Sequence, residues 1–238
     1  MRDGFVKVAA VTPEIVVADC EFNGKSICEK IDEVVKENVE MVVFPELCVT
    51  GYTCTDLFWQ THLLENAYTQ IIRIAEHTKK KNIVAVVGFP FEYEGELFNA
   101  AAVMCNGDIL GIVPKKNLPN YAEFYEARHF TEGYEKVRMV EFGGKEIPFG
   151  MNIIFKWKEN KDFRLAVELC EDVWVPLPPS IGHALAGATV IANLSASDEL
   201  TGKDIYRRSL ISGQSARLIC GYVYADAGEG ESSTDFVY

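Results

Sequence analysis

Three ionisable residues, each at the end of an apolar run, are the strongest candidates for chemistry in this sequence. Glu46 follows the apolar run 41–44 and a proline, Lys115 stands in the segment P-K-K-N-L-P, and Cys170 ends the run L-A-V-E-L-C. A cysteine nucleophile, a carboxylate base and a lysine cation together suit nucleophilic acyl transfer. This chemistry requires neither a histidine nor a metal ion.

Each of the three residues also has a plain structural explanation. Glu46 could begin a helix or form a salt bridge, and Lys115 could belong to a solvated basic turn. Cys170 could be an inert thiol of the core. The catalytic interpretation requires that they meet, because a thiol with a pKa of about 8.5 needs a base or a cation beside it at neutral pH. Glu46 would then take the thiol proton. Lys115 and the backbone N–H of Glu171 would stabilise an oxyanion.

Alternating strands and helices are expected to position these residues. Continuously apolar strands are typical of a sheet buried on both faces, and open α/β sheets place their sites at the carboxyl ends of such strands. The alternation predicts an α/β layered fold. Strands are predicted at 5–12, 41–44, 83–88, 97–105, 108–113, 164–169, 189–194 and 221–225, and helices at 24–38, 57–79, 179–186 and 202–218.

The last residues carry a further expectation about the extent of the domain. The segment Asp235-Phe236-Val237-Tyr238 resembles the beginning of a strand. Because a natural domain seldom ends inside a strand, we expect the 238 residues to be part of a longer protein. No repeat or low-complexity linker interrupts them, so residues 1–238 are predicted to form one domain.

Composition limits the classes of partner and the compartment. With 23 Lys+Arg against 35 Asp+Glu, the formal net charge is −12, which argues against a nucleic-acid or anionic-membrane partner. No apolar stretch approaches the roughly 18 residues of a membrane span. The chain also enters a strand-like run almost at once, without the pattern of a signal peptide. We therefore expect a cytoplasmic protein.

The cysteines and histidines do not form a recognisable metal site. Seven cysteines stand singly in hydrophobic surroundings, and neither C-x-x-C nor H-E-x-x-H occurs. In a reducing compartment the cysteines are expected to be free thiols. A zinc site built by the protein is therefore not expected.

Several motifs resemble those of a known family. Glu46 in F-P-E-L, Lys115 in P-K-x-x-L-P and Cys170 in E-L-C-E-D look like the Glu-Lys-Cys triad of the nitrilase, or carbon–nitrogen hydrolase, superfamily. The chain more narrowly resembles the amidase domain of glutamine-dependent NAD synthetases, from the first strand to the last residue. The segments that carry this narrower resemblance are 48–58, 118–126, 170–176 and 193–197.

The resemblance implies a fold and a mechanism. The fold would be a four-layer α-β-β-α sandwich of the nitrilase type. Cys170 would attack the side-chain amide of glutamine as the nucleophile, with Glu46 as general base and Lys115 as oxyanion stabiliser. Glu123 matches the superfamily's additional active-site glutamate, although it could instead be a loop carboxylate paired with Lys115 or Arg128. Ammonia and a γ-glutamyl thioester would form, and water would hydrolyse the thioester to glutamate.

The resemblance also implies a set of substrate-binding residues. Tyr121 and Phe124 lie on the loop after the lysine, and Ser197 follows a buried strand. The carboxylate of Glu171 suits the α-ammonium group of a free amino acid. Lys203 stands where the family often has an arginine for the α-carboxylate. Because lysine lacks the bidentate fork, the neighbouring arginines remain alternatives for this contact, Arg207 and Arg208.

Partners and cofactors follow from the same resemblance. Full-length synthetases carry a second domain with an S-G-G-x-D-S phosphate loop, and no such segment occurs in this sequence. The amidase domain is therefore expected to need no cofactor, whereas ATP and magnesium would serve only the missing synthetase domain. The expected partners are glutamine, that C-terminal domain and further copies of the chain in a homo-oligomer.

Two other functions remain open at this point. The chain could be a free-standing amidase of the same superfamily that acts on another small amide. It could also be a non-catalytic assembly module whose site is left unformed. Ammonia release from glutamine, compared between the native chain and Cys170→Ala, separates these possibilities from the glutaminase.

Overall fold

Two β-sheets lie face to face in the computed structural model, which describes residues 4–232 and 235–238. The larger sheet has the order β1-β2-β3-β4-β5-β7-β6 and the smaller one β11-β10-β9-β8. The strands of the larger sheet are β1 (Val8–Ala10), β2 (Met41–Val43), β3 (Val84–Tyr93), β4 (Glu96–Cys105), β5 (Asp108–Pro114), β6 (Arg138–Phe142) and β7 (Lys145–Phe149). Those of the smaller sheet are β8 (Phe155–Lys156), β9 (Arg164–Leu169), β10 (Val190–Leu194) and β11 (Gly221–Ala225).

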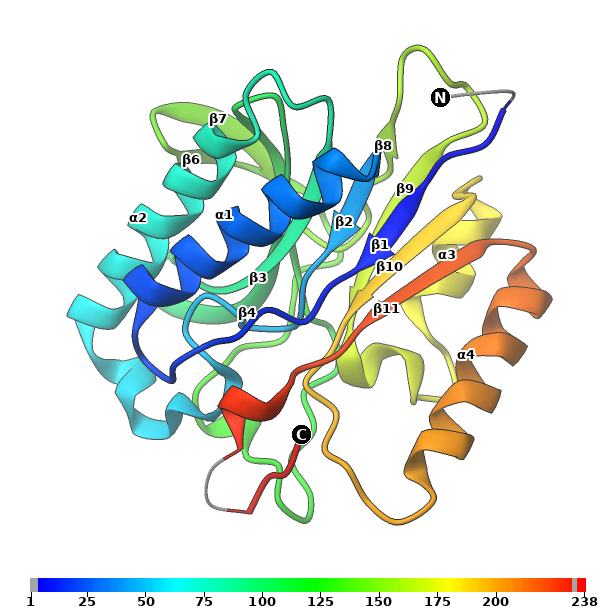
Figure 1. The fold of residues 1–238 in the computed structure, drawn as a ribbon. Coiled ribbons are helices and arrows are strands. Elements are labelled where there is room, and N and C mark those ends of the chain that lie inside the picture. Colours follow the sequence, from blue (N-terminus) through cyan, green and yellow to red (C-terminus); the bar gives the residue numbers. More distant parts are fainter. Residues whose placement is uncertain (1–3, 233–234) are drawn as a thin grey trace.

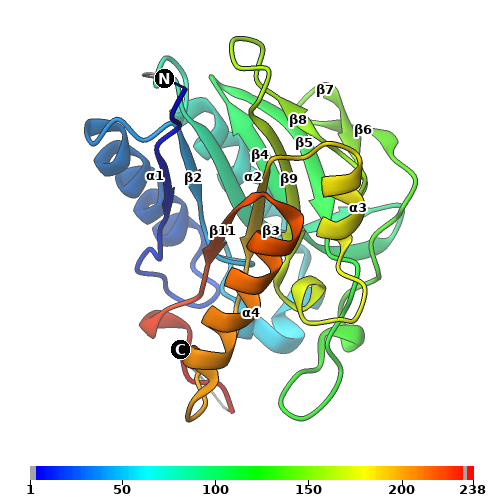
Figure 2. The ribbon, with the colours of Figure 1, turned by 90° about the vertical axis from the view of Figure 1, so that its right-hand side faces the viewer.

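Helices cover the outer face of each sheet, as Figures 1 and 2 show. The helices α1 (Cys20–Lys36) and α2 (Thr61–His77) lie on the larger sheet. The helices α3 (Pro179–Leu185) and α4 (Lys203–Leu218) lie on the smaller one. The layer order is therefore α-β-β-α, which confirms the predicted four-layer sandwich.

Three apolar clusters fill the spaces between the four layers. Successive residues of one strand serve different clusters: Val42 of β2 faces α1 and α2, whereas Val43 faces the smaller sheet. In β9, Val167 faces the larger sheet and Ala166 faces α3 and α4. Because side chains alternate across a strand, a continuous apolar run is what a strand buried on both faces requires.

The helix boundaries differ from the predicted ones for local reasons. The helix α1 begins at Cys20 rather than at residue 24, because the side chain of Asp19 caps it and accepts the N–H of Phe22 at 3.0 Å. The predicted helix 57–79 is divided into the 3₁₀ segment η1 (Tyr52–Trp59) and α2. Thr55, with a φ of 48°, interrupts η1 itself.

Two parts of the sheets were predicted wrongly or not at all. The antiparallel hairpin β6–β7 was not predicted, although its two alternating runs flank the Gly143-Gly144 turn, where both residues have positive φ. The edge strand β8 was also missed. The prediction of a strand at 235–238 is wrong, because these residues form a turn and an irregular segment rather than a ladder. A bond from Glu199 N to Val237 O at 2.7 Å and another from Tyr238 N to Ser232 Oγ at 3.0 Å anchor that segment.

The strands that precede the candidate residues all end on one side of the molecule. Parallel pairing joins β2 to β3 in the larger sheet and β9 to β10 and β11 in the smaller one. The strand β5 runs in the direction of β3, because β4 is antiparallel to both. The loops that carry Glu46, Lys115 and Cys170 therefore leave the two sheets at a common end.

Candidate active site

Glu46 is fixed at the point where the chain leaves β2. Gly88 of β3 permits this path, because a Cβ there would lie 2.5 Å from both Leu47 N and Pro45 O. The backbone N–H of Ala196, which follows β10, donates to Glu46 Oε2 at 2.9 Å. The carboxylate is fully buried and is held by both sheets.

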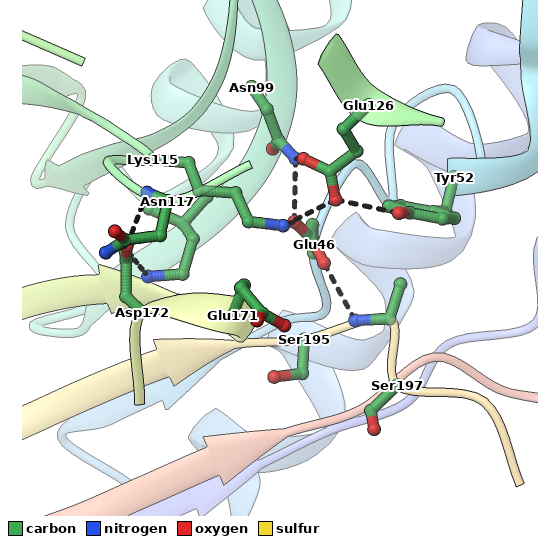
Figure 3. A network of polar contacts seen from close by, with 12 residues as sticks. Glu46, Tyr52, Asn99, Lys115, Asn117, Glu126, Glu171, Asp172, Ser195 and Ser197 are labelled. Carbon is green, nitrogen blue, oxygen red and sulfur yellow. Dashed lines mark hydrogen bonds and ion pairs between the residues drawn. The ribbon is translucent and has the colours of Figure 1, made fainter. Parts of the chain in front are cut away.

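Lys115 lies between two carboxylates at the centre of the site, as Figure 3 shows. Its Nζ is 2.6 Å from Glu46 Oε1 and 2.5 Å from Glu126 Oε1. Burial by itself would lower the pKa of Lys115, but the charges of Glu126 and Glu46 outweigh it and raise that pKa well above its ordinary value. The buried lysine is therefore a permanent cation at neutral pH.

Two neutral side chains complete the cluster around the lysine (Figure 3). Asn99 of β4 donates its Nδ2 hydrogens to Glu46 Oε1 at 2.6 Å and to Glu126 Oε2 at 3.3 Å. The hydroxyl of Tyr52 donates to Glu126 Oε1 at 2.7 Å. The backbone carbonyl of Asn99 accepts the backbone N–H of Lys115 at 2.8 Å. Asn99 therefore holds the lysine through its main chain and both carboxylate partners through its side-chain amide.

The carboxylate next to Lys115 that was expected at Glu123 belongs to Glu126. The loop turns at Ala122, where φ is 49°, and beyond this turn Phe124 and Glu126 point into the protein. Glu123 and Tyr125 alternate with them and are more exposed. Glu123 lines a hollow of about 50 Å³ together with Tyr52 and Glu126, but it makes none of the contacts described for the Lys115 ammonium. The second carboxylate in contact with Lys115 therefore lies three residues beyond the position inferred from the resemblance.

The surroundings of Glu126 affect its protonation. Burial raises the pKa of this carboxyl group, and the nearby Glu46 charge raises it further, while Lys115 opposes the increase. The balance leaves the pKa of Glu126 above its ordinary value. Glu126 is therefore protonated more easily than an ordinary glutamate.

Cys170 lies at a sharp turn directly after β9. Its backbone has a φ of 40°, in the left-handed region, and it begins the 3₁₀ turn η3 (Cys170–Val173). A residue other than glycine rarely adopts this conformation, and such strained residues occur frequently at active sites. The turn places the thiol where the charges of Glu46, Lys115 and Glu126 act on it. The three predicted triad residues are thus brought together.

The thiol of Cys170 is protonated in the resting site. Burial and then the Glu46 charge raise the pKa of Cys170 well above its ordinary value, and Lys115 only partly opposes them. A thiolate therefore does not accumulate before substrate binds. Removal of the thiol proton must accompany the attack, which makes the nearby base essential.

The predicted substrate-binding residues form a second group beside the thiol. The hydroxyl of Tyr121 donates to Glu171 Oε2 at 3.0 Å, and the Tyr121 and Phe124 rings are in edge contact with centroids 5.7 Å apart. The ammonium of Lys203 lies 5.9 Å from the centre of the Phe124 ring and pairs with Asp198. Four of the five predicted residues are thus in one connected set.

Ser197, the fifth, lies on the adjoining loop after β10. Its backbone N–H donates to Asp226 Oδ1 at 2.8 Å. Arg207 is engaged on the same loop, with Nη1 2.7 Å from Glu199 Oε1 and 3.0 Å from Asp226 Oδ2. Arg207 therefore holds the loop through two carboxylates, while Lys203 is paired with one, Asp198.

Several residues of the site were missed in the sequence, although some left a signal. Asn99 interrupts the apolar run of β4 and is an isolated polar residue that needs a buried partner. Glu126 closes the motif segment 118–126 but was not singled out. Tyr52 lies in the motif segment 48–58 but was not singled out, and Asn117 and Asp172 received no role. None of the described residues form a group of three or more His, Cys, Asp and Glu suited to hold a metal ion.

The chain is similar to known proteins over nearly its whole length. The chain matches the carbon-nitrogen hydrolase family over residues 7–217. It is similar to the glutamine-dependent NAD(+) synthetase of Mycobacterium tuberculosis, with 39% identity over 237 residues, which are 100% of this chain and 35% of that protein. The glutamine-dependent NAD(+) synthetase of Aquifex aeolicus is 32% identical over 220 residues, which are 92% of this chain and 35% of that protein. The chain spans about a third of the length of these relatives.

Solved structures extend the comparison to the fold. A glutamine-dependent NAD(+) synthetase from Cytophaga hutchinsonii matches with a TM-score of 0.84 and 32% identity, over 94% of this chain and 36% of that one. A nitrilase-superfamily amidase from Nesterenkonia matches with a TM-score of 0.76 and 17% identity, over 99% and 81% of the two chains, which shows the fold alone. The chain is an amidohydrolase and belongs to the carbon-nitrogen hydrolase family. In the described residues, no helix is long and apolar enough to span a membrane.

Proposed function

We propose that this chain hydrolyses the side-chain amide of L-glutamine to glutamate and ammonia. The observation that carries the proposal is the Lys115 ammonium, held between Glu46 and Glu126 and acting on the thiol of Cys170. Glutamine is favoured among amides because relatives with 39% and 32% identity are named glutamine-dependent. The cluster supplies the base, the cation and the nucleophile that amide hydrolysis requires.

The first half of the reaction forms a thioester. Glu46 takes the proton of Cys170 as the sulfur attacks the amide carbon, and the carbonyl oxygen becomes an oxyanion. The Lys115 ammonium and the backbone N–H of Glu171 stabilise this charge. The C–N bond then breaks, the proton on Glu46 passes to the departing nitrogen, and ammonia leaves a γ-glutamyl thioester on Cys170.

The second half releases glutamate. Glu46, again unprotonated, takes a proton from a water molecule as the water oxygen attacks the thioester carbon. The same lysine stabilises the second oxyanion. The C–S bond then breaks, and the proton held by Glu46 returns to the sulfur. Glu126, which touches Lys115 but not the reacting atoms, holds the ammonium in place throughout.

The second residue group suits the α-amino-acid end of glutamine. Glu171 would accept the α-ammonium group, and Lys203 would pair with the α-carboxylate. Tyr121 fixes the Glu171 carboxylate through the 3.0 Å hydrogen bond, and Phe124 forms an apolar wall under Lys203. Ser197 would contribute a hydrogen bond from the loop after β10.

The same proposal extends to a larger assembly in the cytoplasm. A C-terminal synthetase domain would use the ammonia to amidate deamido-NAD, and it alone would use ATP and magnesium. Support comes from the relatives, of whose length this chain matches about a third. We further propose a homo-oligomer built on the layer of α3 and α4, where large apolar side chains are exposed, including Leu185 at 86% and Ile205 at 70%.

The direct test is ammonia release from L-glutamine by the native chain and by Cys170→Ala. We expect release by the native chain and none by the variant, with a γ-glutamyl adduct on Cys170 detected by mass spectrometry after rapid acid quench. Hydrolysis of a small aliphatic amide but not of glutamine would instead indicate a free-standing amidase. If neither amide is hydrolysed and Cys170 reacts with iodoacetamide no faster than the other six thiols, the chain is an assembly module.

A further inference from the structure

The carboxylate of Asp172 connects the lysine loop to the cysteine turn (Figure 3). Its Oδ1 accepts both the backbone N–H and the side-chain Nδ2 of Asn117, each at 2.8 Å. Its Oδ2 accepts the N–H of Leu169 at 3.0 Å and that of Lys116 at 3.4 Å. One buried side chain therefore receives hydrogen bonds from both segments that present reactive groups.

This connection matters because the reactive groups belong to different sheets. Lys115 follows β5 of the larger sheet, whereas Cys170 follows β9 of the smaller one. Across the described residues, every hydrogen bond between segments 115–117 and 169–173 is made by Asp172. This carboxylate therefore controls the separation of the ammonium from the sulfur locally, and more distant bonds, from Tyr121 to Glu171 and from Ala196 to Glu46, join the two sides of the site elsewhere.

Asp172 also spans the strained residue itself. The Asp172 carboxylate accepts the N–H of Leu169, the residue before Cys170. This hydrogen bond therefore bridges the two sides of Cys170, whose backbone is in the left-handed region. A strained conformation persists only where the surroundings fix it. The same carboxylate therefore holds the thiol in its turn and the lysine loop against that turn.

We propose that Asp172 is a positioning residue, which sets the distance between the Lys115 ammonium and the Cys170 sulfur and so acts on the reaction through both. The inference rests on the proposed amide hydrolysis for its kinetic consequence. Its geometric consequence, the influence of Lys115 on the thiol, is independent of the substrate.

Glu168, on the strand β9 that precedes the turn of Asp172, provides a matched comparison. Both carboxylates are 1% exposed and both accept a backbone N–H, in Glu168 that of Ser180 at 2.7 Å. Glu168, however, faces α3 and makes no hydrogen bond to the lysine loop. Replacing each carboxylate by its amide separates a positioning role from the general effect of altering a buried carboxylate.

The experiment compares Asp172→Asn with Glu168→Gln in the full chain. For Asp172→Asn we expect kcat for glutamine hydrolysis to fall about 10- to 100-fold with KM changed less than about 3-fold, because a small misplacement of reacting groups is costly. Alkylation of Cys170 by iodoacetamide, followed on its tryptic peptide, should also shift to higher pH as Lys115 moves away. For Glu168→Gln, we expect both quantities to stay within about 2-fold of the native values.

A second variant keeps the test decisive if Asp172→Asn fails to fold. Asn117→Ala removes only the side-chain bond at 2.8 Å and should shift the alkylation profile in the same direction by a smaller amount. A native kcat and a native alkylation profile in the folded variants would overturn the positioning role. If the native chain releases no ammonia but both variants still shift the profile, the proposed substrate fails while the positioning role stands.

Discussion

Glu46 and Glu168 are both fully buried carboxylates near the carboxyl ends of buried strands, but their surroundings differ. Glu46 contacts the Lys115 ammonium at 2.6 Å, the Asn99 amide and the backbone N–H of Ala196. Glu168 is held by neutral donors alone among the contacts described, the hydroxyl of Tyr222 and the backbone of Ser180. The first cluster contains a cation, whereas the second does not.

The difference has an electrostatic consequence. A buried carboxylate without a cation is disfavoured by loss of solvation, which raises the pKa of Glu168 to about 7. In the Lys115 cluster, the lysine retains its proton because two carboxylates flank it. The Lys115 ammonium therefore stays charged at neutral pH, whereas the charge of Glu168, between the smaller sheet and α3, changes with pH.

The comparison teaches how one buried residue type can serve two purposes. Where the carboxylates surround a lysine next to a thiol, their charge is available for proton transfer and for fixing a cation. Where the carboxylate bonds to Ser180, whose hydroxyl accepts from Gln214 at 2.9 Å, it joins β9 to α3 and α4. The apolar cluster between the smaller sheet and the helices α3 and α4 is small, so hydrogen bonds contribute to the packing of these two layers.

The strongest test of the distinction removes the cation. Lys115→Ala should abolish ammonia release, by at least about 10²–10³-fold, because it deletes an oxyanion donor. It should also lower the free energy of unfolding by about 3–5 kcal/mol, since two buried carboxylates lose their partner. Urea unfolding and an ammonia assay measure the two effects. Lys116→Ala, which removes an exposed neighbour, is the control, and equal losses in both variants would contradict the assignment.

The next test separates the two glutamates of the following loop. Glu126→Gln should slow glutamine hydrolysis about 10- to 100-fold, because the lysine loses one of the charges that hold it in place. Glu123→Gln should leave the rate within about 2-fold, since the described ion pairs of Lys115 involve Glu46 and Glu126 and not Glu123. Steady-state kinetics of both variants give the comparison. The reverse order of effects would restore the assignment made from sequence.

A smaller effect is expected from the neutral amide in the cluster. Asn99→Ala removes donors to both carboxylates and should cost about 1.5–3 kcal/mol in unfolding free energy, the range for hydrogen bonds to charged groups. We expect the rate to fall about 10-fold through the displaced lysine. Thermal or urea unfolding together with kcat measures this. A native rate with lost stability would show that Asn99 supports the fold but not the reaction.

The smallest effect on activity is expected for Glu168, whose contribution to stability depends on pH. The folded-state pKa of Glu168 is raised to about 7 from 4.5, so the folded chain binds this proton more tightly than the unfolded chain does. Its contribution to stability therefore falls as pH rises from about 4.5 and levels off above about 7.

Glu168→Gln should remove this pH dependence. Relative to the native chain, the variant should gain up to about 3 kcal/mol of stability between pH 4.5 and 8, with kcat for glutamine unchanged. Urea unfolding at a series of pH values measures the difference. A stability difference that does not vary with pH would show that the carboxyl group is not protonated in the folded state.

Much of the fold could be predicted because local patterns decide it. The runs 164–169 and 221–225 match β9 and β11 residue for residue. The predicted strands 97–105 and 108–113 correspond to β4 and β5, which pair antiparallel across Asn106-Gly107. The errors arose where the pattern was short or incomplete, as in the two-residue strand β8, or where tertiary contacts rather than a ladder fix the chain, as at 235–238.

Prediction of the site was less complete for a different reason. Glu46, Lys115 and Cys170 each end a recognisable strand, and the structure brings them together. Glu126 lies on an irregular loop, where no period indicates which side chains point inward. The turn at Ala122 decides this, and it selects Glu126 in place of Glu123.

The sequence alone determined the layered α/β class, the strand ends that carry the three reactive residues, and an acidic surface with net charge −12. These properties depend on composition and on the spacing of neighbours along the chain. Only the tertiary structure decided that Asn99, Tyr52 and Glu126 surround the lysine, and that Asp172 connects it to the thiol turn. Such contacts join residues far apart in sequence, so they exist only after both sheets have packed.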